Sequence, residues 1–330
     1  MWNAFELTRQ LVDVFGPSGQ EGDISQVIAD LARPYADDLT TDALGNLIVH
    51  RKGDGPRLML AAHMDTVGLV VTYFEKDGTL RLGKLGGITP MDIRNAPVRF
   101  QNGIHGAVKV HGKADESKLT IDDLYLDIGA ANREEAQSMV ALGDVCVFSA
   151  PTVQNRSRVI SPYLDNRISC AVLLMALERL RESQYDLYAV FTVQEELGLR
   201  GAKPAAYGVD PQLAIALDVT ATYDYPGAPK AGSAALGAGA AIKVMDASVI
   251  CRPELVDKLS SLARAHQIKA QMDVLTRGGT DAGAILPIRH GVITGGISVP
   301  CRYSHTPTSV ADLVDVESCV QLVTTFIESR

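Results

Sequence analysis

The feature of this 330-residue chain that most constrains its fold is an apolar segment that runs directly into two acidic residues. Every position of the segment 188–193 is aromatic, β-branched or apolar, which is typical of a buried β-strand. Glu195, Glu196 and Gly198 follow at once. In an open parallel sheet, ligands bind outside the carboxyl ends of the strands, so this segment predicts a site at that edge of a sheet.

Three other apolar segments end in the same way, with an acid or an imidazole close to where the predicted strand stops. Asp165 also lies just before a mainly apolar run, 168–180, and therefore at the predicted N-terminus of a helix. Because parallel strands share one carboxyl edge, these side chains are predicted to converge. The three segments are 57–62 before His63 and Asp65, 213–217 before Asp218, and 291–297, which a short loop joins to His305.

The converging side chains are ligand types that suit zinc, cobalt or manganese. Carboxylates held together at a buried rim repel one another and lose hydration, so without cations they would have to take up protons. Three ionised carboxylates and two neutral imidazoles balance two divalent ions once a bound hydroxide is added, and this charge count favours two ions over one. The ligand set predicted on this basis is His63, Asp165, Glu196, Asp218 and His305.

The pattern of apolar and turn residues differs between two regions of the chain, which predicts two domains. Helical periodicity near the N-terminus, and helix–strand alternation after residue 155, predict an α/β fold. The predicted domain has three layers, α/β/α, in which helices cover both faces of a mostly parallel central sheet. Within this pattern, 254–265 and 316–327 are predicted helices.

The stretch from Val67 to Asn155 differs, because short alternating runs are separated there by turn residues. Only 132–140 has helical character. We therefore predict a small β-rich, barrel-like domain inserted into the larger one. The predicted boundaries are residues 1–66 and 156–330 for the catalytic domain and 67–155 for the inserted domain.

Composition argues against several other classes of protein. The formal net charge of −8 disfavours a general nucleic-acid-binding protein. No apolar run approaches the roughly 18 residues that a membrane span needs, and no basic N-terminal segment precedes an apolar one. The sequence therefore predicts a cytoplasmic protein without a membrane partner. The five cysteines are scattered, without metal-binding spacing, and are expected to be reduced and mostly buried.

Eight short motifs follow one another along the chain. They are Gly16-Pro17-Ser18-Gly19, Asp42-Ala43-Leu44-Gly45-Asn46, Ala62-His63-Met64-Asp65, Leu164-Asp165-Asn166-Arg167, Gln194-Glu195-Glu196-Leu197-Gly198, Leu217-Asp218-Val219-Thr220, Gly278-Gly279-Thr280-Asp281-Ala282 and Tyr303-Ser304-His305-Thr306. In type and order they resemble the motifs of the family-42 metallopeptidases of clan MH, which include tetrahedral and glutamyl aminopeptidases. The resemblance covers nearly the whole chain, including the position of the inserted domain.

The resemblance implies a role for each matching ligand. Asp165 would bridge two metal ions. His63 and Asp218 would complete the ligands of one ion, and Glu196 and His305 those of the other. It also implies dodecamers that enclose a chamber, with the inserted domain making dimer contacts.

Glu195 would be the general base in such an enzyme, and Asp65 would orient His63. Two ions that share a water lower its pKa from 15.7 towards about 7 and polarise the scissile carbonyl. Glu195 lies next to a ligand in sequence, so it can pass the proton of this water to the departing amine. We therefore predict an aminopeptidase that trims N-terminal residues from short peptides.

Alternatives stay open for the pocket and for the reaction. Arg277, Gly279 and Asp281 are candidates for the substrate pocket, although a plain glycine turn explains the same sequence. An N-acyl-amino-acid deacylase or a carboxypeptidase would use a related site with two ions. A glycoside hydrolase would use Glu195 and a second carboxylate as acid and base, without need of the imidazoles. A non-catalytic assembly protein is the remaining class.

Overall fold

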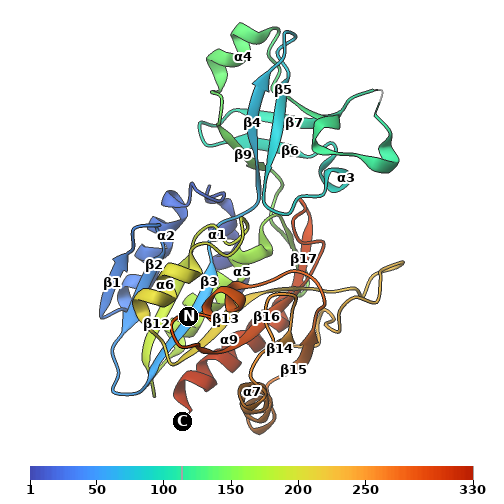
Figure 1. The fold of residues 1–330 in the computed structure, drawn as a ribbon. Coiled ribbons are helices and arrows are strands. Elements are labelled where there is room, and N and C mark those ends of the chain that lie inside the picture. The colour runs from blue at the N-terminus through green and yellow to red at the C-terminus, as the bar shows by residue number, and fades with distance from the viewer. Residues whose placement is uncertain (113, 330) are drawn as a thin grey trace.

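The computed structural model describes residues 1–112 and 114–329. A broad sheet with helices on both faces forms the larger part of the molecule, and a small barrel stands on it (Figure 1). Both termini belong to the larger part (Figure 1).

The large sheet contains strands from both sides of the barrel in sequence. Within the described residues its strands are β1 (Asp38–Thr41), β2 (Leu47–Arg51), β3 (Arg57–His63), β10 (Val153–Asn155), β11 (Arg158–Ser161), β12 (Asp186–Thr192), β13 (Leu213–Ala221), β14 (Ala240–Met245), β15 (Ala270–Val274), β16 (Ile293–Arg302) and β17 (Ser309–Asp312). The central strands β12, β3, β13 and β16 are neighbours in this order and run parallel, as the sequence predicted. Antiparallel pairs extend the sheet on both sides, and the parallel pair β14–β15 joins it at β16.

Helices cover both faces of this sheet. They are α1 (Ala4–Asp13), α2 (Gly22–Ala32), α5 (Leu164–Arg179), α6 (Ala202–Val209), α7 (Pro253–Ala265), α8 (Asp281–Ile285) and α9 (Leu313–Glu328), with the 3-10 turn η1 (Arg33–Tyr35) after α2. Alternation along β3 shows how one strand serves two cores: Leu58, Leu60 and Ala62 join the core under α1, α5 and α9, whereas Met59 and Ala61 join the core under α6 and α8. This three-layer arrangement confirms the predicted fold class.

The barrel is built from six consecutive strands with a core of their own. These are β4 (Gly68–Phe74), β5 (Leu80–Leu85), β6 (Pro97–Phe100), β7 (His105–Val110), β8 (Leu124–Asp127) and β9 (Val145–Phe148). They close in the order β4, β5, β8, β7, β6, β9, and every pair is antiparallel. Val12, Phe15 and Tyr163, which lie outside the barrel in sequence, pack into the same core. The barrel is therefore anchored to the larger part through shared apolar side chains.

Short elements were the least predictable. The helix expected at 132–140 is α4 (Arg133–Met139). The same region also contains α3 (Pro90–Ile93) and the 3-10 turns η2 (Glu116–Lys118) and η3 (Ile121–Asp123), so the prediction of one helical segment there was wrong. Elements of this length are too short to show a helical period. The short strands β10, β11 and β17 escaped detection for the same reason.

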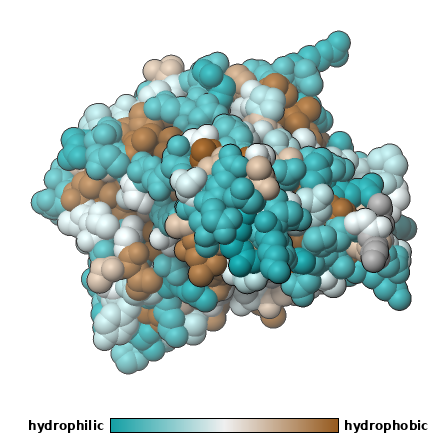
Figure 2. Space-filling model, turned by 90° about the horizontal axis from the view of Figure 1, so that it is seen from above, coloured by the Kyte–Doolittle hydropathy of each residue, from teal (hydrophilic) through white to brown (hydrophobic). Residues whose placement is uncertain are grey.

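The surface and the cysteines add little to the exclusions drawn from composition. Among the described residues, no helix combines the length and apolar character needed to cross a bilayer. The five cysteines are buried and free, as expected. Seen from the barrel side, the surface is mainly hydrophilic, with apolar residues in separate groups (Figure 2).

Candidate active site

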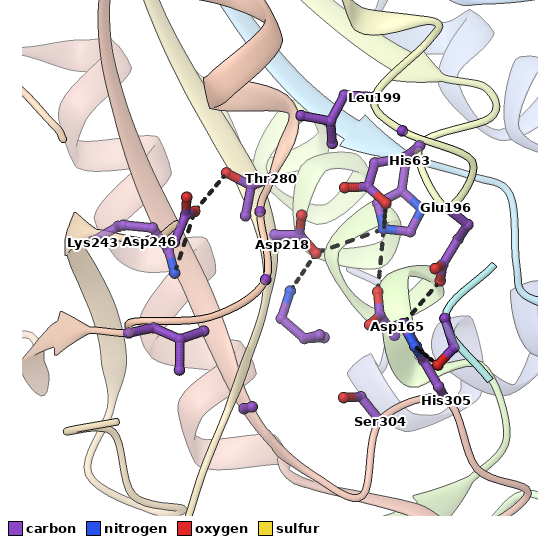
Figure 3. A pocket seen from close by; sticks show the side chains of 18 residues that line it. His63, Asp165, Glu196, Leu199, Asp218, Lys243, Asp246, Thr280, Ser304 and His305 are labelled. Carbon is purple, nitrogen blue, oxygen red and sulfur yellow. Dashed lines mark hydrogen bonds and ion pairs between the residues drawn. The ribbon is translucent and has the colours of Figure 1, made fainter. Parts of the chain in front are cut away.

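Acidic and imidazole side chains from separate segments converge in one cluster (Figure 3). Asp165 lies between the two imidazoles: its Oδ1 is 3.2 Å from His63 Nε2, and its Oδ2 is 3.2 Å from His305 Nε2. Glu196 Oε1 lies 3.2 Å from His305 Nε2, and Asp218 Oδ1 lies 3.7 Å from His63 Nε2. The structure thus brings together all five side chains named as ligand candidates.

The parallel centre of the sheet places most of this cluster at one edge. In the ladder between β12 and β3, Thr192 pairs with His63, so the residues that follow β12 lie beside this imidazole. Asp218 belongs to β13, which runs next to β3. His305 arrives by a longer route than expected, because β16 continues to Arg302 and His305 follows in a loop with a φ of 62°.

Asp165 lies at the start of α5, where the backbone is not yet helical. Asp165 and Asn166 have non-helical φ and ψ angles, and regular helix begins after them. The Asn166 side-chain amide donates a hydrogen bond of 2.9 Å to the carbonyl of Leu217, next to Asp218. This bond fixes the turn that carries Asp165 relative to β13.

Asp65 holds together the strand ends that carry the imidazole and the two glutamates. Its fully buried carboxylate accepts hydrogen bonds from the backbone N–H groups of Glu195 at 3.0 Å and Glu196 at 3.2 Å, and from Ser18 Oγ at 2.6 Å. Its Oδ1 also lies 3.4 Å from His63 Nδ1. The backbone carbonyl of Asp65 lies 3.2 Å from the same nitrogen. The role of Asp65 in orienting His63 stays a prediction, and its bonds to the glutamate turn were not foreseen.

A loop from the barrel packs on two members of the cluster. The carbonyl oxygen of Gly87 lies 3.0 Å from His305 Nδ1, within hydrogen-bond distance. The preceding Gly86 has a φ of +89°, and a Cβ there would lie only 2.7 Å from a methyl group of Val67 and 3.3 Å from Glu196 Oε2. This close approach requires glycine. If Nδ1 of His305 donates to Gly87, its Nε2 keeps a lone pair facing the carboxylates.

Crowding at the cluster shifts the pKa values of its members. Burial raises the pKa of Glu196 and of Asp218, and raises the pKa of Glu195 well above its usual value with help from the neighbouring carboxylates. Burial works against protonation of His305, yet Glu196 and Asp165 outweigh it and raise the imidazole pKa to about 12. Asp165 is also buried, but the two imidazoles hold its pKa below the usual range. Bound cations would oppose these shifts, because they favour the ionised carboxylates and the neutral imidazoles.

The cluster fits a metal centre. Ligand atoms of His63, Asp165 and Glu196 all lie within 4.8 Å of one another, and so do those of His63, Glu195 and Asp218. Glu196 Oε1 is buried and accepts no hydrogen bond from a described residue, although an imidazole nitrogen is close by. Two ligands of one tetrahedral zinc ion would be about 3.3 Å apart, given metal–ligand distances of about 2.0–2.1 Å. The separations within the cluster are similar, and its nitrogen and oxygen donors suit zinc, cobalt or manganese.

Glu195 differs from its neighbour in what surrounds its carboxylate. Its Oε2 lies 3.8 Å from His63 Nε2, and no described residue donates a hydrogen bond to this carboxylate. The side chain faces a cavity of about 390 Å³ that also opens onto the rest of the cluster. Glu195 is therefore placed to exchange a proton with a molecule in this cavity.

The three predicted pocket residues have three different positions. Gly279 lines the cavity, whereas Arg277 and Asp281 do not. Arg277 is exposed, and Asp281 is buried behind the cluster, where its Oδ2 accepts a hydrogen bond of 2.5 Å from Thr192 Oγ1. Its other oxygen has no hydrogen-bond partner among the described residues, and burial raises the pKa of Asp281 to about 7.

Two charged residues that the sequence analysis did not single out also line the cavity. Lys243 and Asp246 lie across it from the imidazoles, with Thr280 beside them (Figure 3). A signal for Lys243 was present in the sequence, because a lysine interrupts the otherwise apolar strand 240–244.

The fold and the cluster together define the class of protein, and known proteins agree. The backbone of this chain matches the structure of aminopeptidase APDkam598 from Desulfurococcus kamchatkensis with a TM-score of 0.95 and 35% identity, over 99% of this chain and 95% of that one. The chain is therefore a peptide hydrolase. The profile of the M42 glutamyl aminopeptidase family matches residues 45–322, and the chain belongs to this family of metal-dependent aminopeptidases.

Two further relatives match nearly the whole length of the chain. The chain is 35% identical to the lysyl aminopeptidase of Pyrococcus furiosus, over 98% of this chain and 96% of that one. The Pyrococcus horikoshii TET1 peptidase, which can assemble into a tetrahedron or a large octahedral shell, matches with a TM-score of 0.89 and 33% identity over 98% of this chain and 99% of that one. Membership of this family disfavours the glycoside hydrolase and the non-catalytic assembly protein.

Proposed function

We propose that the protein uses two divalent ions to remove the N-terminal residue from short peptides. The observation that carries this proposal is the pair of adjacent glutamates in one cavity: Glu196 contacts an imidazole in the cluster, whereas the Glu195 carboxylate is free of hydrogen bonds from described residues. Asp165, with one oxygen towards each imidazole, is the proposed bridge between the ions. His63 and Asp218 complete the ligands of one ion, and Glu196 and His305 those of the other.

The reaction needs a general base and a route for one proton. When bound, the ions would supply Lewis-acid polarisation of the scissile carbonyl and lower the pKa of water. Glu195 accepts a proton from the attacking water and delivers it to the nitrogen of the departing peptide. The raised pKa of Glu195 suits this exchange, because the base must hold the proton between the two steps. Asp65 keeps the glutamate turn and His63 in register during the reaction.

We further propose an organisation in which residues 1–66 and 156–330 carry the site and residues 67–155 mediate self-association. The closed barrel from β4 to β9 supports this division. Exposed apolar side chains on the barrel, Tyr73, Met91 and Leu142, support a role in contacts between subunits. A dodecamer is the assembly expected from the family resemblance. Zinc or cobalt are the proposed ions, with manganese as an alternative.

The proposal is tested with the purified full-length chain, first treated with a chelator and then reconstituted with zinc, cobalt or manganese. Aminoacyl anilides and N-acylated amino acids serve as the two substrate panels. We expect release of the aniline only from reconstituted protein, with two ions per chain by elemental analysis. Hydrolysis of the N-acylated panel alone would instead identify a deacylase or a carboxypeptidase. Turnover that survives chelation would refute a metal-dependent reaction.

A further inference from the structure

The glutamate turn, residues 193–201 after β12, is held through its backbone by side chains from other segments. The N–H groups of residues 193–196 all donate to buried side chains. The first donates to Asn46 Oδ1 at 3.0 Å, the second to Glu21 Oε1 at 3.1 Å, and the third and fourth to Asp65, as described above. The first three carbonyls of the turn accept hydrogen bonds from its later residues. The path of this backbone is therefore fixed by its donors and by its acceptors.

The backbone matters here because the side chain of Glu195 has little else to aim it. No described residue donates a hydrogen bond to its carboxylate, so the direction of this group depends on the backbone that carries it. The preceding residue, Gln194, has a φ of 53°, in the left-handed region that is costly for a residue other than glycine. Glu21 accepts its hydrogen bond from this same residue. Glu21 thus stabilises the strained position next to the proposed base.

Glu21 itself lies outside the active cavity. Its side chain is 7% exposed and lines a different cavity, of about 400 Å³, together with Gly45 and Val193. The oxygen that accepts from Gln194 also accepts from Gly19 N at 2.8 Å, which fixes the carboxylate in one orientation. A peptide held at the cluster does not reach Glu21, so this residue can act on the reaction only through the turn.

Glu21 ends a loop, residues 16–21, that contacts every segment that the centre of the site is built on. The Ser18 hydroxyl donates to Asp65. The Arg167 guanidinium, two residues after the proposed bridging ligand, donates to the Gly16 carbonyl at 3.2 Å. The last residue of the loop reaches the glutamate turn. The function proposed above leaves this loop without a role, and its contacts suggest one.

We propose that Glu21 is a positioning residue for the general base: its carboxylate fixes the backbone of Gln194 and thereby aims the Glu195 carboxylate into the cavity. This inference rests on the proposed function, because it takes Glu195 as the base. Without an acceptor at position 21, the buried N–H of Gln194 would lose its partner and the left-handed residue would lose its support. The base would then move away from the attacking water, and a displacement of about 1 Å can cost about 10²-fold in rate.

Three substitutions of Glu21 separate the hydrogen bond from the charge. Glu21→Met keeps the size without the acceptor, Glu21→Asp keeps the charge on a side chain one methylene shorter, and Glu21→Gln keeps an oxygen that can accept both N–H groups. On the metal-reconstituted protein, kcat should fall by about 10- to 100-fold for Met and severalfold for Asp, and stay within about threefold for Gln. KM and metal content should stay at the wild-type values, because neither substrate nor ion contacts residue 21.

A matched control removes the same kind of bond elsewhere. Asp315, on α9, is fully buried, and its carboxylate accepts hydrogen bonds from Gly237 N at 2.7 Å and Gly239 N at 2.6 Å. It does not line the active cavity. Asp315→Leu therefore deprives two backbone N–H groups of their acceptor, as Glu21→Met does, and should lower stability while leaving kcat unchanged.

A double-mutant cycle with Glu195→Gln tests whether Glu21 acts through the base. Once the base is removed, its position no longer matters, so adding Glu21→Met should change the residual turnover by less than about twofold. If the full loss caused by Glu21→Met persists in the Glu195→Gln background, Glu21 acts on something other than the base, and the inference is wrong.

Hydrogen–deuterium exchange of the glutamate turn reports its order without turnover, in metal-free and in reconstituted protein. Residues 193–196 should exchange faster in Glu21→Met and Glu21→Asp than in wild type, and at the wild-type rate in Glu21→Gln. If Glu21→Met does not fold, the comparison of Asp with Gln gives the same answer. If wild type cleaves no anilide, faster exchange in these variants would still support the positioning of the turn, and the proposed function alone would be refuted.

Three further outcomes would overturn the inference. Wild-type kcat and exchange in both Glu21→Met and Glu21→Asp would show that the turn holds its shape without this carboxylate. Equal losses in Glu21→Gln and Glu21→Met would show that the charge matters rather than the hydrogen bond. A loss of bound metal in Glu21→Met would place its effect at the ions instead of the base.

Discussion

The two ends of the cavity bury charges in opposite ways. At the metal end, carboxylates outnumber the imidazoles, and Glu196 Oε1 is left without a hydrogen bond from a described residue. At the other end, Lys243 Nζ lies 2.6 Å from Asp273 Oδ2, and Asp246 accepts hydrogen bonds from Ser248 and Val249. The metal end has an excess of carboxylates, whereas the other end pairs its buried lysine with a carboxylate.

This difference shows what each end can recruit. Cations or protons relieve an excess of buried carboxylates, and either lowers the repulsion that every member of the cluster experiences. A buried lysine that already lies beside a carboxylate forms an ion pair and requires no further cation. We therefore expect substitutions at the metal end to act on all substrates alike, and substitutions at the Lys243 end to act on some substrates only.

The largest expected effect is that of Glu195→Gln at the metal end. The amide keeps the shape of the side chain but cannot accept the proton of the attacking water, so kcat should fall by about 10²- to 10⁴-fold for every substrate. The metal content, measured by elemental analysis, should stay at the wild-type value. Near-normal turnover would show that Glu195 is not the general base, and the metal end would then have no identified base.

Removal of single ligands should separate the bridge from the other members of the cluster. Asp165→Ala removes the carboxylate whose two oxygens each lie 3.2 Å from an imidazole nitrogen, so it should lower the occupancy of both ions. Asp218→Ala should lower the occupancy of one ion, with a loss of affinity of about 10- to 100-fold or more. Equilibrium dialysis against zinc measures both. Equal losses in the two variants would contradict the bridging position of Asp165.

Asp281 allows the destabilisation caused by the excess of buried carboxylates to be measured in metal-free protein. Its pKa is raised from 3.8 to about 7 by burial, so the folded chain binds more protons than the unfolded chain between these values. Stability is therefore lost as the pH rises from about 4 to 7. Asp281→Asn resembles the protonated acid, and the variant should gain on the order of 1–3 kcal/mol relative to wild type between pH 5 and 8.

Urea unfolding of chelator-treated protein at pH 5 and at pH 8 gives the free energy of unfolding of the variant and of the wild type. A difference between variant and wild type that is independent of pH would show that Asp281 does not change its charge in this range.

The smallest expected effect is that of Gly296→Ala at the Lys243 end. The added Cβ would lie 3.0 Å from Lys243 Cβ, so the lysine must move by a few tenths of an ångström. We expect a loss of about 1 kcal/mol in stability and a severalfold change in kcat/KM that differs between substrates with different first residues. The metal content should not change. A uniform loss across substrates would argue that the two ends are not independent.

The sequence predicts features that follow from the order and direction of the strands. It does not predict features that depend on how loops fold back or on which residues of two strands are paired. The convergence of His63, Glu196 and Asp218 follows from connectivity, because residues after parallel neighbouring strands meet at one edge. The bonds from the backbone of Glu195 to Asp65 depend on how two loops fold back on each other. No spacing in the sequence reports such a contact.

The Lys243 end shows the same limit. The lysine in an apolar strand was visible, but its partner Asp273 is paired with it only through the register of β14 and β15. Register is set by packing across the sheet rather than by either strand alone. Arg277 and Asp281 were predicted near the pocket for their place in a glycine-rich motif, and the path of the loop turns both away from the cavity.

The contact between Gly87 and His305 limits how the barrel can be engineered. Residues 86–87 follow β5 and lie against Glu196 and His305. They therefore form part of the candidate active site, although in sequence they belong to the barrel segment. Deleting the insert, or grafting a foreign one at its ends, would release the ring of His305 from its backbone support. A transplanted barrel would have to carry its own equivalent of this glycine pair to keep the imidazole aimed at Asp165.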